Sequence, residues 1–228
     1  MNKLLLLSNP VFDTPSFFEF ANIILNADSK VFIINYANEP KMLFKRFNRI
    51  GTPEITKKYI DELYEKLEFF SIPRENIILS SDDDTLSCFM EKFNQSEVLI
   101  FCGGAAESLL DKLEVLGVTD LIKNSNKSAI AYSAGAEIFL DFLTLLPSSF
   151  WQNAGNYYKV LSTRKALGFV NGLVLAFHHT DSRDDDIQKI CNSLNSRIVA
   201  LSDEDGVFVE NEDMTWIGNP KIFTPLGD

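Results

Sequence analysis

Residues 129–137 read Ala-Ile-Ala-Tyr-Ser-Ala-Gly-Ala-Glu, and this stretch decides the fold. An apolar run typical of a buried strand stops at Ser133, and a stretch of helical character follows it. Two small residues, Ala131 and Gly135, stand two positions before and two positions after the serine. This pattern is typical of a nucleophile elbow, a tight strand-to-helix turn that presents a hydroxyl above the sheet. A serine that merely caps a helix is the other interpretation of the same residues.

Short apolar runs alternate with amphipathic stretches on both sides of this turn. Strands are predicted at 4–7, 30–36, 77–79, 98–102, 128–132, 173–177, 198–201, 207–210 and 215–218, the last two as an antiparallel pair. Helices are predicted at 17–25, from Thr52-Pro53 through Leu67, and at 85–93, 106–116, 119–124 and 134–145. Strands that alternate with helices predict right-handed crossovers and a mostly parallel sheet. We therefore expect an α/β fold, a three-layer sandwich with helices on both faces of the sheet, formed as a single domain over residues 1–228.

Bulk composition excludes several classes of protein. The 228 residues carry a formal charge of −11 and no basic stripe, which argues against nucleic-acid binding. The apolar run at 4–7 is too short for a signal peptide, and no segment approaches the length of a membrane span. Cys88, Cys102 and Cys191 are widely spaced, so they predict neither a disulfide framework nor a zinc site. We expect a cytoplasmic protein that does not bind membranes, and the sequence leaves open whether it is a monomer or a homodimer.

Two further motifs could serve a serine nucleophile. Gly103 and Gly104 end a predicted strand, where glycines let backbone amides approach a ligand closely, although a plain tight turn also explains them. The only two histidines, His178 and His179, follow another apolar run. Imidazole is the base that a serine nucleophile needs near neutral pH. A structural role at the end of the strand is the alternative for either ring.

These landmarks occur in the order found in a known family. Gly103-Gly104 is followed by Leu109-Leu110, then by Tyr-Ser-Ala-Gly-Ala at 132–136, then by the histidines before Thr180 and Arg183. The sequence thus resembles peptidase family S51, the dipeptidase E and cyanophycinase serine peptidases, whose flavodoxin-like fold is related to class I glutamine amidotransferases. The resemblance implies a serine hydrolase that acts on small peptides without a metal or other cofactor. Dipeptidase E releases an N-terminal aspartate, and cyanophycinases cut at the β-carboxyl of aspartate.

The resemblance also assigns roles to individual residues. Ser133 matches the nucleophile and His178 the base, with His179 as the alternative base or a contact of the substrate. Arg183 falls near a family arginine and could bind a substrate carboxylate through two N–H groups. The backbone amides that would hold the oxyanion are those of Gly104 or Ala105, together with that of Ala134.

The chain departs from the family pattern at the third catalytic group. Dipeptidase E places an orienting aspartate after the nucleophile helix, but here the only acids between the serine and the histidines are Glu137 and Asp141. Glu137 and Asn153 are the candidate orienters, although an asparagine cannot stabilise an imidazolium as a carboxylate does. The family's usual asparagine and glycine are also replaced by Ala105 and Ala131. Three functions stay open: a serine peptidase, a catalytically impaired binding or regulatory protein, and an esterase or amidase for small molecules.

Overall fold

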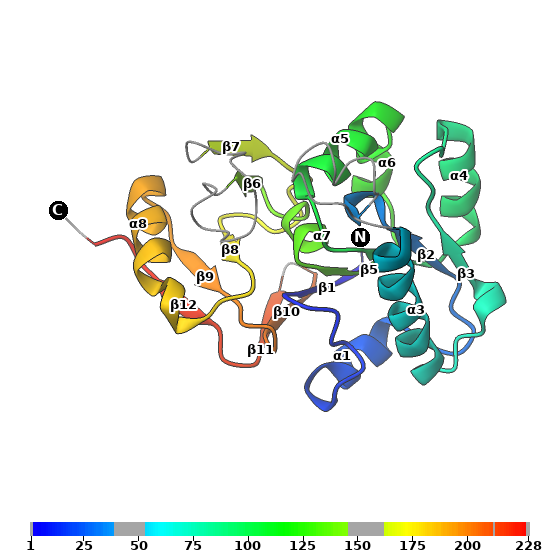
Figure 1. The fold of residues 1–228 in the computed structure, drawn as a ribbon, viewed down its shortest axis with the longest axis horizontal. Coiled ribbons are helices and arrows are strands. Elements are labelled where there is room, and N and C mark those ends of the chain that lie inside the picture. The colour runs from blue at the N-terminus through cyan, green and yellow to red at the C-terminus, as the bar shows by residue number, and fades with distance from the viewer. Residues whose placement is uncertain (1, 39–52, 146–161, 212, 227–228) are drawn as a thin grey trace.

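The fold is built around a seven-stranded sheet (Figure 1). The computed structural model describes residues 2–38, 53–145, 162–211 and 213–226. The strand order is β11-β10-β1-β5-β4-β2-β3. The strands are β1 Lys3–Leu7, β2 Val31–Ile34, β3 Ile77–Leu79, β4 Val98–Phe101, β5 Ser128–Tyr132, β10 Gly206–Glu210 and β11 Asp213–Ile217. The run from β1 to β3 is parallel, while β10 and β11 are added antiparallel, so the predicted mostly parallel sheet is confirmed.

Helices cover both faces of this sheet, as Figure 1 shows. Side chains alternate along β1, so that Leu4 and Leu6 enter one hydrophobic core while Leu5 and Leu7 enter the other. The first core is closed by α4 (Leu86–Gln95), α5 (Ala106–Leu116) and α6 (Thr119–Lys123), and the second by α1 (Pro15–Ile24) and α3 (Pro53–Phe69). Both faces of the central parallel strands β1, β2 and β4 are therefore buried, which explains why these strands are apolar without alternation.

A smaller sheet lies at the end of the molecule opposite α4 (Figure 1). It has the order β12-β9-β8, with β8 (Val174–Ala176) parallel to β9 (Ile198–Ala200) and β12 (Lys221–Phe223) antiparallel to β9. Helix α8 (Asp184–Leu194) packs on it through a separate small core. Parallel pairing brings the carboxyl ends of β8 and β9 to the same edge, which positions the two loops that follow them.

The prediction of one helix over 134–145 was wrong. The helix α7 spans only Ala134–Glu137, and β6 (Phe142–Leu145) follows and pairs with β7 (Ser162–Lys165). In β6 the exposed Phe142 is followed by the fully buried Leu143, which is the alternation of a strand. An apolar run of this length fits a helix or a strand, and pairing with β7, which is distant in sequence, decided the outcome.

Helix α8 was not predicted, although its sequence carries a start signal. Its first turn contains Asp184, Asp185 and Asp186. Acidic side chains suit a helix N-terminus because they face the positive end of its dipole.

No helix in the described ranges is long and apolar enough to cross a membrane. The expectation of a single domain stays a prediction.

Candidate active site

Ser133 occupies the strained turn that the sequence predicts. It follows β5 and stands at the N-cap position of α7, where its side chain makes no capping hydrogen bond. Its φ of 51° and ψ of −124° form a conformation that is rare for a residue other than glycine. Such a backbone costs on the order of 1–3 kcal/mol and persists only where its surroundings enforce it. The Ser133 N–H donates to the carbonyl of Leu7 at 2.9 Å, and the Ser133 carbonyl accepts from Ala136 at 2.8 Å. The turn is therefore fastened to β1 on one side and to its own helix on the other.

The small residues around the turn are required by close backbone contact. A Cβ on Gly135 would lie 2.2 Å from the carbonyl oxygen of Phe101, at the end of the neighbouring strand. A Cβ on Gly103 would lie 3.1 Å from that of Ser133. Ala131 is fully buried. The arms of the elbow thus touch the Gly103-Gly104 turn directly, which brings that turn beside the serine.

His178 lies beside the serine. Its Nε2 is 3.0 Å from Ser133 Oγ, which is within hydrogen-bonding distance. The residue follows β8 at the carboxyl edge of the smaller sheet, with the positive φ of 54°. Nη1 of Arg183 donates to its carbonyl oxygen at 3.1 Å, so the predicted substrate-binding arginine lies next to the proposed base.

Asp203 supplies the carboxylate that the sequence analysis did not find. Its Oδ1 lies 2.6 Å from His178 Nδ1. The residue is in the loop after β9, and the carboxylate of the buried Asp205 holds this loop by accepting from the N–H groups of Ser202 at 2.8 Å and Asn219 at 2.7 Å. Serine, imidazole and carboxylate thus form an unbroken chain of contacts, an arrangement that can remove a proton from the hydroxyl and stabilise the resulting imidazolium.

Of the two orienters named from the sequence, only Glu137 lies among the described residues. Asn153 lies outside the described residues. Glu137 lies in α7, and the contact at His178 Nδ1 is made by Asp203 instead. Burial, with a smaller contribution from the nearby Glu107, raises the pKa of Glu137 to about 8. Glu137 is therefore largely protonated at neutral pH, and a neutral carboxyl is a poor partner for an imidazolium.

One of the three amides named for the oxyanion is already engaged. The N–H of Ala105 donates to the carbonyl of Ala37 at 3.0 Å, so it is a structural contact. Gly104, with φ 132°, and Ala134, the first residue of α7, stay as candidates, because Ala134 follows Ser133 and Gly104 follows Gly103, which lies against the serine. Backbone N–H groups of this kind can stabilise the negative charge that develops on the substrate oxygen.

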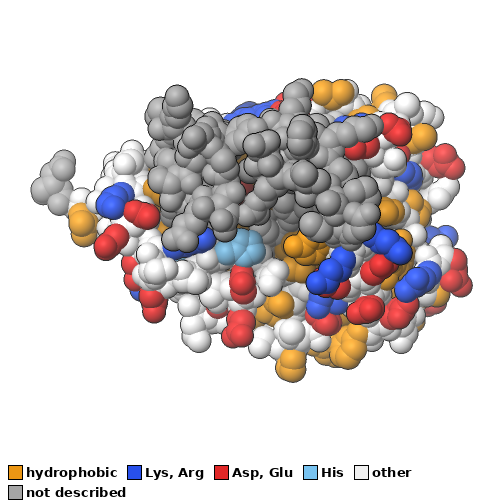
Figure 2. Space-filling view, in the orientation of Figure 1, with side chains coloured by type: hydrophobic (Ala, Val, Ile, Leu, Met, Phe, Trp, Pro, Cys, Tyr) orange, Lys and Arg blue, Asp and Glu red, His pale blue; other side chains and the backbone are white. Residues whose placement is uncertain are grey.

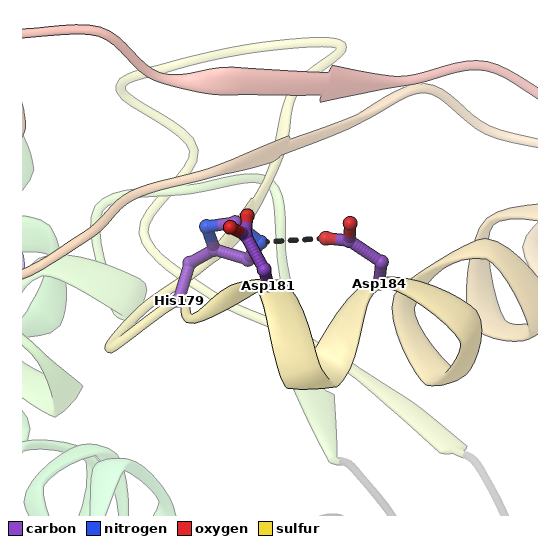
Figure 3. A group of neighbouring side chains, drawn as sticks. All are labelled: His179, Asp181 and Asp184. Carbon is purple, nitrogen blue, oxygen red and sulfur yellow. Dashed lines mark hydrogen bonds and ion pairs between the residues drawn. The ribbon is translucent and has the colours of Figure 1, made fainter.

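His179 lies in a polar cluster with Asp181 and Asp184, at the start of α8 (Figure 3). Its ring is buried, and Nε2 lies 2.9 Å from Oδ1 of Asp184. Ligand atoms of His179, Asp181 and Asp184 lie within 4.8 Å of one another, as in a metal site. However, the ammonium of Lys221 contacts both carboxylates and lowers the pKa of Asp184, with a further contribution from His179. Lys221 supplies the positive charge here, and the cluster fastens β12 to the start of α8.

The charge pattern of the visible face is mixed. Lys and Arg side chains are interspersed with Asp and Glu in Figure 2, with no basic stripe among the residues that the view colours. A histidine side chain also reaches this surface. The expectation that the chain does not bind nucleic acid stays a prediction.

Comparison with known proteins identifies the family. The solved structure of a protein from Listeria monocytogenes EGD-e, provisionally named peptidase E, is similar over 95% of this chain and 98% of that chain, with a TM-score of 0.64 and 17% sequence identity. At this identity the likeness shows the fold, and it confirms the predicted fold class. No curated protein sequence matches the chain. The model of peptidase family S51 matches residues 50–217, which is well over half of the sequence. The chain therefore belongs to peptidase family S51.

Proposed function

We propose that this chain is a serine peptidase that hydrolyses small peptides through Ser133, His178 and Asp203. The observation that carries the proposal is the pair of contacts at the imidazole, 3.0 Å to the hydroxyl and 2.6 Å to the carboxylate. Both contacts occur at a strained elbow, in a chain that belongs to a peptidase family. A hydroxyl that only capped a helix would need neither an imidazole nor a carboxylate behind it.

The proposed reaction follows from these three groups. His178 Nε2 accepts the proton of Ser133 as Oγ forms a bond to the peptide carbonyl carbon, and the amides of Gly104 and Ala134 stabilise the oxyanion. The imidazolium then donates this proton to the leaving amine, and the C–N bond breaks. Water attacks the acyl-enzyme with His178 again as base, which releases the acid and restores the serine. Asp203 keeps the proton on Nδ1 and stabilises the imidazolium in both half-reactions.

Small peptides with an N-terminal aspartate are the proposed substrates. The family resemblance suggests them, and Arg183 is the cationic side chain nearest to the proposed base among the contacts described, since it donates to the His178 carbonyl. A guanidinium can bind a carboxylate through two parallel N–H groups. The net charge of −11 does not attract an acidic peptide, so a local cation of this kind is needed.

A panel of dipeptides tests the proposal. Purified wild type is assayed on Asp-X, Glu-X and Ala-X dipeptides, beside Ser133→Ala. We expect hydrolysis of the Asp-X members and a loss of about 10⁴-fold or more in turnover for the variant. Ser71→Ala is a matched control, because Ser71 is an exposed serine that also has a positive φ, of 60°, at the end of α3. Equal rates for wild type and Ser133→Ala would refute the proposal.

A catalytically impaired binding protein is favoured only if the histidine has no orienting carboxylate. Asp203 lies in contact with His178, so this alternative is now the weaker one. An esterase or amidase would use the same three groups, so the panel includes p-nitrophenyl acetate and an aspartyl anilide. Turnover of the ester without turnover of any peptide would favour that function.

A further inference from the structure

Two consecutive residues at the end of β1 hold the proposed nucleophile and the proposed base. The carbonyl of Leu7 accepts the N–H of Ser133 at 2.9 Å. The hydroxyl of Ser8 accepts the N–H of His178 at 2.8 Å, across 170 positions of sequence. The adjacent residues Leu7 and Ser8 thus connect the backbone of Ser133, which follows the large sheet, to the backbone of His178, which follows the smaller sheet.

The contact with Ser8 is made to a strained backbone. His178 has φ 54°, in the left-handed region that residues other than glycine rarely adopt. Such a conformation persists only where neighbouring groups fix it. Here the N–H is held by Ser8 and the carbonyl by Arg183 at 3.1 Å. The peptide groups on both sides of the His178 Cα are therefore fixed, and so is the direction in which its ring leaves the backbone.

Ser8 itself has little freedom to move. It is fully buried, and its hydroxyl also donates to the carbonyl of Leu201 at 3.4 Å. The same carbonyl accepts the N–H of His179 at 2.8 Å. The hydroxyl proton is thus directed toward Leu201, which leaves an oxygen lone pair for His178. A side chain with this burial does not contact substrate, so any effect of Ser8 on the reaction must pass through its neighbours.

We infer that Ser8 is a positioning residue for the reaction, which holds His178 in the left-handed conformation that aims Nε2 at Ser133. The inference rests on the proposed function and assigns a role to a residue outside the triad. In Ser8→Ala the N–H of His178 loses its acceptor, and the strained conformation loses one of its two restraints. Because a displacement of about 1 Å in a catalytic group can cost about 100-fold in rate, we expect kcat to fall by about 10- to 100-fold. KM should stay within about twofold of wild type.

Kinetics with two matched variants separate positioning from stability. Ser29→Ala is the control, since Ser29 is also a buried serine whose hydroxyl accepts a backbone N–H, from Asn26 at 2.9 Å. We expect Ser8→Ala and Ser29→Ala to lower Tm by similar amounts, with only the first lowering kcat. Ser8→Thr keeps the hydroxyl and should recover most of the lost rate. A kcat for Ser8→Ala within twofold of wild type would overturn the inference.

A double variant tests whether Ser8 acts through His178. If it does, adding Ser8→Ala to His178→Ala should leave the residual rate unchanged, because the ring that Ser8 positions is already gone. A further loss as large as that in the wild-type background would contradict the inference. This result decides the question even if Thr at position 8 does not fit its buried site.

Nuclear magnetic resonance of the imidazoles separates this inference from the proposed function. The chain has two histidines, so His179→Gln assigns both sets of ring signals. In Ser8→Ala we expect the ¹⁵N and ¹H shifts of the His178 ring to change, because its contact with Asp203 is disturbed, while those of His179 stay in place. Unchanged His178 shifts would overturn the inference. A wild type that hydrolyses no peptide would instead refute the proposed function, and the ring shifts would still decide the role of Ser8.

Discussion

Asp203 Oδ1 lies 2.6 Å from His178 Nδ1, although 25 positions separate the two residues. The topology of the smaller sheet explains this proximity. His178 follows β8 and Asp203 follows β9, and these strands are parallel neighbours whose carboxyl ends meet at one edge. Ligand and catalytic groups gather at this edge in open α/β sheets. The pairing of β8 with β9 thus places Asp203, the third group of the proposed triad, beside a histidine that precedes it in the sequence.

Replacing Asp203 by Asn should reduce kcat by about 10²- to 10⁴-fold, with a small change in KM. The amide keeps the shape of the side chain but cannot stabilise the imidazolium, and it can favour the wrong ring tautomer. Glu204→Gln is the control, because Glu204 is an exposed acid in the same loop. Steady-state kinetics on the best dipeptide provide the measurement. Equal kcat values for the two variants would argue against a role for Asp203.

Asp205→Ala should weaken both activity and stability. The buried Asp205 carboxylate accepts two backbone N–H groups, from Ser202 and Asn219, and these hold the loop that carries Asp203. Its removal leaves both donors without their partner, and an unpaired donor costs about 1–3 kcal/mol to the extent that water cannot reach it. We expect a fall of at least about tenfold in kcat together with a lower midpoint in urea. Unaltered kcat in a protein with a lowered midpoint would show that the loop keeps Asp203 in place without Asp205.

Gly135→Ala should destabilise the fold severely. The new Cβ would lie 2.2 Å from the carbonyl oxygen of Phe101, and a backbone atom in a buried strand cannot give way cheaply. We expect a loss of about 3 kcal/mol or more in the free energy of unfolding. Gly117→Ala is the matched control, since it has φ 70° with nothing near its Cβ and should lose only about 1 kcal/mol. Urea unfolding compares the two, and losses of equal size would contradict the close contact at the elbow.

Glu137→Gln should remove a pH dependence of stability. Burial, together with the negative charge of Glu107, raises the pKa of Glu137 from 4.5 to about 8. Between these pH values the folded protein keeps a proton that the unfolded chain has lost, so the free energy of unfolding falls as pH rises through this window. The variant cannot ionise, so its advantage over wild type should be larger at pH 8.5 than at pH 4.5, by on the order of a few kcal/mol.

Urea unfolding at pH 4.5, 6.5 and 8.5 measures this difference. Glu91→Gln serves as the control because Glu91 is exposed, and its difference from wild type should not grow with pH in this way. A Glu137→Gln profile that runs parallel to wild type at all three pH values would contradict the raised pKa.

The parts of the fold with a local cause could be predicted from the sequence. The elbow at Ser133 and the helix Ala106–Leu116 follow from a strand signal, small residues and helical periodicity, and α5 has the predicted bounds. The expected membership of peptidase family S51 is also confirmed, by the match of the family model to residues 50–217. The proximity of His178 to Ser133 agrees with the role expected for each, while their catalytic function stays a prediction.

The parts set by long-range pairing could not be predicted in the same way. Residues 142–145 form a strand because β7 pairs with them, and nothing in their own periodicity excludes a helix. Asp203 lies beyond His178, outside the stretch between the serine and the histidine in which the family pattern places the orienting acid. One available signal is its place two residues after the predicted strand 198–201. An acidic residue just after the carboxyl end of a parallel strand is a candidate catalytic group, because such ends meet at one edge of the sheet whatever their order in the sequence.

Covalent labelling tests the central claim most directly. The protein is treated with a fluorophosphonate, which bonds to a serine only where a base activates the hydroxyl, and the modified peptide is mapped by mass spectrometry. We predict one phosphonyl adduct, on Ser133, whose rate of formation falls at least about 100-fold in His178→Ala and in Asp203→Asn. An unmodified Ser133, or labelling at the same rate in all three proteins, would contradict the account.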